Sequence, residues 1–271
     1  MVWIGPDLGI RRMMRPFLKA KWVCAGTFAV LAAALPASDN ARAADIHLVT
    51  ENYPPFNFME DGKIVGVGAD QVREIMQRQG IEFSLEMMPW SRAYWLAENR
   101  KNHCVFTTAM TPARADSFSW ISPLGGAELL LVKKAGTQVP SSITDIAQTS
   151  SVGTQRSDYS EYVLQNNGFS NIDYFDDIGA IIRQLTQERL DLAAISSMMF
   201  HTLIEQGVDV ELVHGFGDII GNGIACHPDT DQALLGKMQN GLNKIIADGF
   251  QLKTLKKYAA SSAESAQLSD N

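Results

Sequence analysis

Three segments place aromatic or polar side chains where predicted strands end, a common position for ligand contacts in parallel-sheet proteins. Tyr53 follows the first predicted strand in a Pro-rich turn, where the prolines fix the loop and the ring could form the wall of a site. Trp90 stands at a strand-to-helix junction and could stack on a ring or a cation. Thr107 and Thr108 end another strand and could offer hydroxyl groups. Each has a structural alternative, because rings usually cover a core and threonines are ordinary strand residues.

Charged side chains supply further candidates without marking a catalytic site. Arg92 follows Trp90 by two positions and could bind an anionic group of a ligand or merely a surface carboxylate. Glu51 and Asp158 could act as acid and base across a cleft, yet neither has a sequence neighbour that indicates catalysis. No Gly-x-Ser-x-Gly motif, Cys–His–Asn pattern or phosphate loop stands out. The sequence therefore predicts a protein that is not an enzyme.

Two His–Cys neighbours, His103 with Cys104 and Cys226 with His227, raise the question of a metal site. Adjacent residues on a strand point to opposite faces of the sheet, so neither pair can converge on one ion. The other histidines show no metal-ligand spacing, namely His47, His201 and His214. We therefore expect neither a metal nor a cofactor.

The first 43 residues have the features of a secretory signal. A basic segment at 1–21 precedes a short apolar run at 22–37, and Ala-Arg-Ala at 41–43 forms a small-x-small cleavage site. The apolar run is short for a membrane span, although an uncleaved anchor is the alternative. Cys24 lies within the apolar run and leaves with the signal, and Met13 or Met14 could be the true start. We predict cleavage near Ala43 and export to the periplasm.

Removal of the signal makes the protein more acidic. The whole chain of 271 residues carries a formal charge of −7, and removing residues 1–43 leaves 17 basic and 28 acidic residues, a charge of −11. That balance argues against a nucleic-acid binder, whose affinity would rest on clustered Lys and Arg. Apolar residues make up 46% of the chain, as in globular proteins.

The mature chain alternates predicted strands and helices in two similar series. The first series has strands at 45–50, 81–87, 104–108 and 127–133, and helices at 69–79 and 91–100. The second has strands at 151–154, 172–175, 190–195, 210–213 and 223–226, and helices at 158–165, 177–188, 197–206 and 231–248, with a last helix reaching 258.

Such repeated strand–helix–strand units predict an α/β fold of mainly parallel sheets flanked by helices. Two series in this length predict two lobes, joined by two hinge crossings, with a ligand cleft between them. We expect lobe one at 44–133 and 222–258, lobe two at 134–221, and a disordered tail at 259–271. The long helix at 231–248 follows a return strand, so it could pack back on lobe one.

Nine short motifs follow one another along this chain. They are Glu-Asn-Tyr-Pro-Pro-Phe-Asn-Phe at 51–58, Asp-Gly-Lys-Ile-Val-Gly at 61–66, Pro-Trp-Ser-Arg-Ala at 89–93, Thr-Pro-Ala-Arg at 111–114, Phe-Ser-Trp-Ile-Ser-Pro at 118–123, Val-Gly-Thr-Gln at 152–155, Glu-Arg-Leu-Asp at 188–191, Gly-Ile-Ala at 223–225 and Ala-Asp-Gly at 247–249. In this order they resemble the bacterial extracellular solute-binding proteins of family 3, over about residues 45–258. The Pro-Trp-x-Arg-Ala element resembles a divergent branch of that family.

The resemblance implies a role for several residues. Arg114 matches the cleft arginine that clamps a ligand carboxylate, a task that suits the bidentate guanidinium. Ser157 and Asp158 occupy the helix start that holds the carboxylate in relatives, although Asp158 could instead cap the helix. Ser196 stands where amino-acid receptors keep an aspartate for the α-ammonium, which puts a standard α-amino acid in doubt. Cys104 and Cys226 would lie on neighbouring strands, either bridged or as buried thiols.

The resemblance also implies a function. A periplasmic monomer would trap a small polar, carboxylate-bearing solute by hinge closure and deliver it to an ABC permease in the inner membrane. Two alternatives stay open on the same scaffold: a periplasmic dehydratase or lyase, and a ligand sensor for a separate membrane partner.

Overall fold

The structure is a computed structural model that describes residues 1–2 and 46–258. The predicted signal peptide and the predicted tail at 259–271 lie outside the described residues, apart from Met1 and Val2. Within the described part, no helix is both long and apolar enough to cross a membrane.

Eight strands form one mixed sheet in the order β4-β1-β5-β10-β6-β9-β7-β8. The short strands at both ends of this order pair in parallel, and the two long strands β6 and β10 pair antiparallel to each other and to β9 and β5. The strands are β1 (Ile46–Thr50), β4 (Phe83–Met87), β5 (His103–Ala109), β6 (Ser119–Lys134), β7 (Val152–Gln155), β8 (Ile172–Phe175), β9 (Leu192–Ser196) and β10 (Val210–Cys226), with a separate hairpin of β2 (Phe58–Glu60) and β3 (Lys63–Val65).

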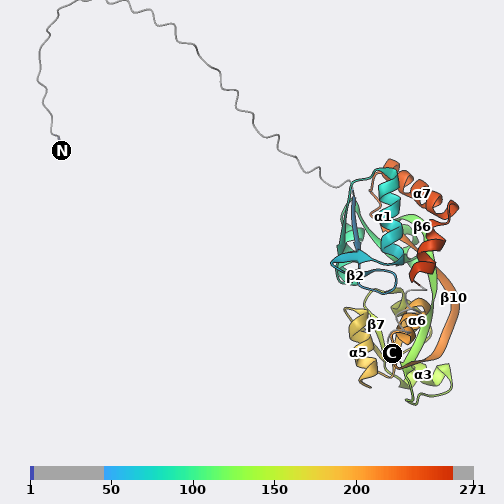
Figure 1. Ribbon diagram of the computed structural model, residues 1–271. Helices are drawn as coiled ribbons and strands as arrows, with labels where there is room; N and C mark the ends of the chain where they lie inside the picture. The colour runs from blue at the N-terminus through green and yellow to red at the C-terminus, as the bar shows by residue number, and fades with distance from the viewer. Residues whose placement is uncertain (3–45, 259–271) are drawn as a thin grey trace, which may run out of the picture. The chain divides into compact units, whose positions relative to one another are not determined.

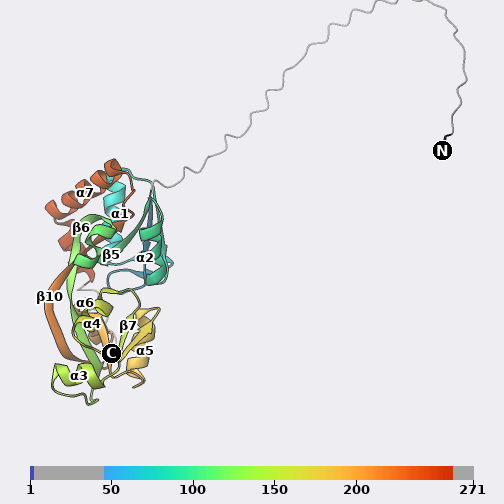
Figure 2. The same cartoon turned by 180° about the vertical axis from the view of Figure 1, so that it is seen from behind.

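The two long strands connect the two halves of the sheet. Figures 1 and 2 show β6 and β10 side by side, running from the half that carries α1, α2 and α7 to the half that carries α3, α5 and α6. We call the first half, with β4, β1 and β5, lobe one, and the second half, with β9, β7 and β8, lobe two. The predicted fold of mainly parallel strands flanked by helices is thus confirmed. The strands predicted at 127–133, 210–213 and 223–226 were too short, because each is part of one of these continuous crossings.

Most helices begin and end where local chemistry predicts. Asp158, Asp177 and Asp231 are N-caps whose side chains accept backbone N–H groups, and Gly80 ends a helix in the left-handed conformation. The helices are α1 (Val67–Gln79), α2 (Trp90–Asn99), α3 (Ile143–Thr149), α4 (Tyr159–Asn166), α5 (Ile178–Thr186), α6 (Ser197–Glu205) and α7 (Gln232–Ala247), with a 3-10 turn η1 (Pro112–Ser117) and a final helical segment at 250–258. The helix α3, the turn η1 and the β2–β3 hairpin were not predicted from the sequence.

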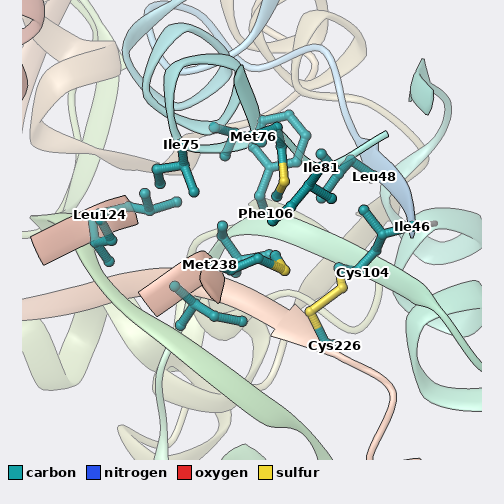
Figure 3. Packing of buried hydrophobic residues seen from close by; sticks show 14 of the residues in the cluster. Ile46, Leu48, Ile75, Met76, Ile81, Cys104, Phe106, Leu124, Cys226 and Met238 are labelled. Atoms are coloured by element: carbon teal, nitrogen blue, oxygen red, sulfur yellow. A yellow bond between two sulfur atoms is a disulfide. The ribbon is translucent and has the colours of Figure 1, made fainter. Parts of the chain in front are cut away.

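The core of lobe one lies between its strands and the helices α1 and α7. Figure 3 shows Ile75 and Met76 of α1 converging with Phe106 of β5 and Met238 of α7. The long C-terminal helix therefore packs back on lobe one, as the sequence predicts. Gly241 makes this approach close, because a Cβ there would lie 3.0 Å from Ile75 Cγ2.

Cys104 and Cys226 form a disulfide inside this core (Figure 3). They are directly opposite each other on the antiparallel pair of β5 and β10, and both are fully buried. The sequence left open whether these cysteines are bridged or are buried free thiols, and in the structure they are bridged. It links the first half of the chain to the return strand across 122 positions.

Lobe two has two core clusters, one on each face of its part of the sheet. One contains Ile181 and Leu185 of α5 with Val132, and the other contains Leu164 of α4 with Leu131. Along β6, Leu124 belongs to the core of lobe one, and the buried residues from Leu129 onward belong to the core of lobe two. The strand thus passes from one lobe to the other before residue 133, where lobe one was predicted to end. The exact lobe boundaries stay a prediction.

Candidate functional site

A cavity of about 100 Å³ lies between lobe one and lobe two. A single water molecule needs roughly 10–15 Å³ of such a volume. The cavity therefore has room for about eight water molecules or for a small solute. Its lining comes from both lobes: Glu51, Tyr53, Phe56, Asn57, Trp90, Phe106, Thr107 and Ala109 precede the first crossing, Ala127, Glu128 and Leu129 belong to β6, and Gln155, Asp158, Tyr159, Ser160, Ala194, Ser196, Ile220 and Asn222 follow.

The turn after β1 supplies much of the lobe-one wall. This turn packs tightly on Gly66, where a Cβ would lie only 2.3 Å from the backbone oxygen of Phe56. Gly66 also has a φ of 122°, which a residue with a side chain rarely adopts. The close packing directs Tyr53 toward lobe two, where its hydroxyl accepts a 2.9 Å hydrogen bond from the Ser196 backbone N–H. Tyr53 is therefore part of the cavity wall and also contacts the opposite lobe.

Only one of the two predicted threonines reaches the cavity. Thr107 is the unpaired residue of a β-bulge, since Phe106 pairs with Ile224 and Thr108 pairs with Gly223. It has a φ of 58° and lines the cavity, where its hydroxyl accepts a 2.5 Å hydrogen bond from Asn57. Thr108 is fully buried, and its hydroxyl donates to the Val105 backbone oxygen at 3.2 Å. The prediction of Thr108 as a ligand contact is therefore not supported by its position.

Asp158 and Ser196 line the cavity while they cap helices. The Asp158 carboxylate accepts from the Ser160 backbone N–H at 2.9 Å and starts α4, which is the alternative role that the sequence offered for it. The Ser196 hydroxyl accepts from the Met199 backbone N–H at 3.1 Å and starts α6. These bonds hold both side chains in place at the lobe-two edge of the cavity.

Arg114 lies beside the cavity rather than in its lining. Its guanidinium donates to the backbone oxygen of Ala109 at 3.1 Å and to that of Ser157 at 2.8 Å. It is nearly buried, 7% exposed, next to the rings of Trp90 and Tyr94. The predicted clamp arginine thus binds two carbonyl groups, one in each lobe.

Ser157 contributes its backbone rather than its hydroxyl to this contact. It has a φ of 61°, and its carbonyl oxygen also accepts a 3.1 Å bond from Trp90 Nε1. Trp90 both lines the cavity and bonds to the other lobe, whereas Ser157 is outside the lining. Arg92 is exposed on α2, away from the cavity, so the structure does not bring it to the site.

Several lining residues were not among the predicted contacts. Asn57, Glu128 and Gln155 were missed, whereas Glu51 was considered as an acid or base across the cleft. Asn222 precedes the predicted return strand, a place from which it could face the cleft or form a turn. Gln155 lies at the end of β7, and Asn222 lies beside a bulge of β10. Glu128 lies in the middle of the crossing strand β6. A search of strand ends could have found Gln155, but only the paired crossing strands bring Glu128 to the same cavity.

Glu51 is the most perturbed acid of the cavity. Although part of its surface faces the cavity, its carboxyl group is closely surrounded by protein, and this loss of hydration raises its pKa to about 8. Asp158 and Asp177 add to the rise, and the hydrogen bond from Gln155 opposes it. Burial also raises the pKa of the Tyr53 hydroxyl. At neutral pH, Glu51 is therefore mostly protonated.

Among the described residues, no three His, Cys, Asp or Glu side chains are arranged to hold a metal ion.

The model of the bacterial extracellular solute-binding proteins, family 3, matches residues 46–261. The chain belongs to this family. The match covers most of the chain and agrees with the order of motifs; the divergent branch stays a prediction. No curated protein matched the chain.

Solved structures of this family's architecture are similar to the chain. One is the arginine-, lysine- and histidine-binding protein ArtJ from Geobacillus stearothermophilus, with 17% identity and a TM-score of 0.72 over 79% of this chain and 94% of that one. Another is the substrate-binding protein of an amino acid ABC transporter, with 17% identity and a TM-score of 0.71 over 79% and 98%. A third is a histidine kinase sensor domain similar to periplasmic binding proteins, with 16% identity and a TM-score of 0.71 over 79% and 96%. At these identities the likeness shows the two-lobed fold.

Proposed function

We propose that this family 3 protein captures a small polar solute in the cavity between its lobes and delivers it to an ABC permease in the inner membrane. The observation that carries the proposal is the cavity itself, which both lobes line and which has the size of a small solute. The similarity to the substrate-binding protein of an amino acid ABC transporter supports delivery to a permease. The protein acts as an exported monomer.

Closure of the lobes traps the solute. Three contacts join the lobes around the cavity: Glu51 with Gln155, Tyr53 with Ser196, and the Ser157 carbonyl with Trp90 and Arg114. The strands β6 and β10 are the two chain crossings, so bending there opens the cavity. The register of β10 against β6 shifts between Gly215 and Ile219, close to the cavity residues Glu128 and Ile220.

A carboxylate on the solute would need a change at Arg114. The guanidinium would have to leave the Ser157 carbonyl before it could clamp a ligand carboxylate bidentately. The carboxylate-bearing solute that the sequence predicts thus has no free clamp in this arrangement, and the polar solute is the part of the prediction that the cavity supports.

A thermal-shift screen of the purified protein against amino acids, amines, organic acids and sugars tests the proposal. A solute at about 100 times its Kd should stabilise the protein by about 2.7 kcal/mol. The Trp90→Ala variant should lose this shift, whereas Trp95→Ala, an exposed tryptophan on the same helix, should keep it. If no solute of any charge shifts the unfolding temperature, the proposed function is wrong.

Two alternatives have their own support. The similar sensor domain supports ligand sensing through a membrane partner, and neighbouring genes for a permease and ATPase, or for a sensor, separate the two roles. A lyase gains support because Glu51, which is protonated at neutral pH, lines the same cavity as the carboxyl group of Asp158. Product formation from arogenate or prephenate would establish the lyase, and tight binding without product would exclude it.

A further inference from the structure

The walls of the cavity are acidic. Three lining residues carry carboxyl groups, Glu51, Glu128 and Asp158, and none of the described lining residues is Lys, Arg or His. Arg114, which lies beside the cavity, directs its donors to backbone carbonyls. A solute with a net negative charge would therefore face carboxyl groups and no partner of opposite charge.

The three acids bind only neutral groups in the part of the chain that the structure describes. Glu51 accepts from the Gln155 amide at 2.6 Å, Glu128 from the Gly217 backbone N–H at 2.8 Å, and Asp158 from Ser160. None of them forms an ion pair with a described residue. Half-buried carboxylates are usually paired. Protonated Glu51 carries no charge, so Glu128 and Asp158 are the two acids that leave a cationic partner to be supplied.

A polar side chain that lines the same cavity has an acceptor atom to which no described residue donates a hydrogen bond. Asn222 lines the cavity from β10 and is only 7% exposed, and its Oδ1 has no hydrogen-bond partner among the described residues. A buried acceptor without a partner costs free energy that a ligand N–H group would recover. An ammonium offers three donors and a guanidinium five, whereas a carboxylate offers none.

The apolar part of the wall suits a cation as well. Five aromatic side chains line the cavity, and the negative faces of such rings attract cations. They are Tyr53, Phe56, Trp90, Phe106 and Tyr159. Acids, a free acceptor and rings thus all favour the same ligand charge.

We infer that the solute is a small organic cation, a primary amine or a guanidine, that carries no carboxylate. This inference rests on the proposed function and names the substrate class of the same cavity. The amine or guanidine donates to Asn222 and to the acids, and its carbon chain packs on the rings. Arg114 keeps its place between the lobes in the bound state and contributes to closure rather than to ligand charge recognition.

Matched pairs of ligands test the inference, since arginine and agmatine, or lysine and cadaverine, differ only by the carboxylate. Calorimetric titration of the purified protein should show the decarboxylated member of at least one pair binding at least about tenfold tighter. An amino acid that binds as well as its amine overturns the inference, and so does a neutral or anionic solute that binds when no amine does. In both of these cases the proposed function survives. Failure of every solute, in contrast, removes the proposed function together with the inference.

Charge-removing variants give a second test with a matched control. Asp158→Asn keeps a capping oxygen for α4 and should weaken binding of the preferred amine by about tenfold or more. Asp231→Asn makes the same change at the cap of α7, outside the cavity, and should leave the affinity unchanged. If Asp158→Asn does not fold, Glu128→Gln serves in its place. Unchanged amine affinity in the folded variant overturns the inference.

Discussion

Gln155 Nε2 donates a 2.6 Å hydrogen bond to Glu51 Oε2, joining residues 104 positions apart. Glu51 follows the first strand of lobe one, and Gln155 ends β7 of lobe two. The contact is therefore made only when the lobes are close together. Because the pKa of Glu51 is raised to about 8, the contact is also sensitive to pH.

Glu51 should make the protein less stable as the pH rises. Its pKa moves from an ordinary value of 4.5 to about 8 in the folded protein, so between these values the folded state holds a proton that the unfolded state has lost. The free energy of unfolding should then fall by up to about 1.4 kcal/mol per pH unit in this window. Urea denaturation between pH 5 and 8 would measure it.

The variant Glu51→Gln should lose this contribution and show a flatter stability profile. Glu60→Gln, at an exposed position of β2, is the matched control and should keep the wild-type slope. Parallel profiles for wild type and Glu51→Gln would contradict the assignment of the proton to Glu51.

Arg114 should act on closure more than on ligand charge. Arg114→Lys keeps the positive charge but loses the planar fork that binds the two carbonyls, which removes a charged hydrogen bond worth about 1.5–3 kcal/mol. We expect the Kd of the identified solute to rise by about tenfold or more, and the radius of gyration measured by X-ray scattering to increase. If Arg114→Lys instead lost only carboxylate-bearing ligands, with no change in the free protein, the clamp role predicted from the sequence would be right.

The Tyr53 hydroxyl should contribute modestly to ligand affinity through its contact with lobe two. Tyr53→Phe removes the acceptor of the Ser196 N–H but keeps the ring in the wall. The expected loss is about 0.5–1.5 kcal/mol, or roughly two- to twelvefold in Kd by calorimetry. Tyr162→Phe, at an exposed position of α4, should leave the Kd unchanged; equal effects of the two substitutions would speak against the interlobe contact.

The disulfide should stabilise lobe one strongly. It spans 122 positions, and removing such a bridge typically costs about 2–5 kcal/mol. The double variant Cys104→Ala/Cys226→Ala should show this loss in urea denaturation, and a reducing agent should destabilise the wild type but not the variant. Equal sensitivity of both proteins to the reductant would mean that the bridge has no such role.

Local chemistry predicted the elements well where the signal lay within a few residues. The alternation around Phe83 and Leu85 predicted β4, and the spacing of Ile178, Ile181 and Leu185 predicted α5. The aspartate caps and Gly80 set helix ends by hydrogen bonds to their own neighbours. Only the second half of β6 and the two ends of β10 were predicted, because the remaining parts contain several glycines, which weaken the local strand signal. These parts gain strand structure by pairing with each other.

The sequence alone determined the family, most of the strands and helices in their order, and several helix caps, since these depend on neighbouring residues and on motifs in a fixed order. The tertiary structure alone decided the character of the site. It turned Thr107 into the cavity through a bulge, directed Arg114 to carbonyl groups, and brought Glu128, Gln155 and Asn222 to the same wall. These directions depend on contacts between residues about a hundred positions apart, which a local pattern does not contain.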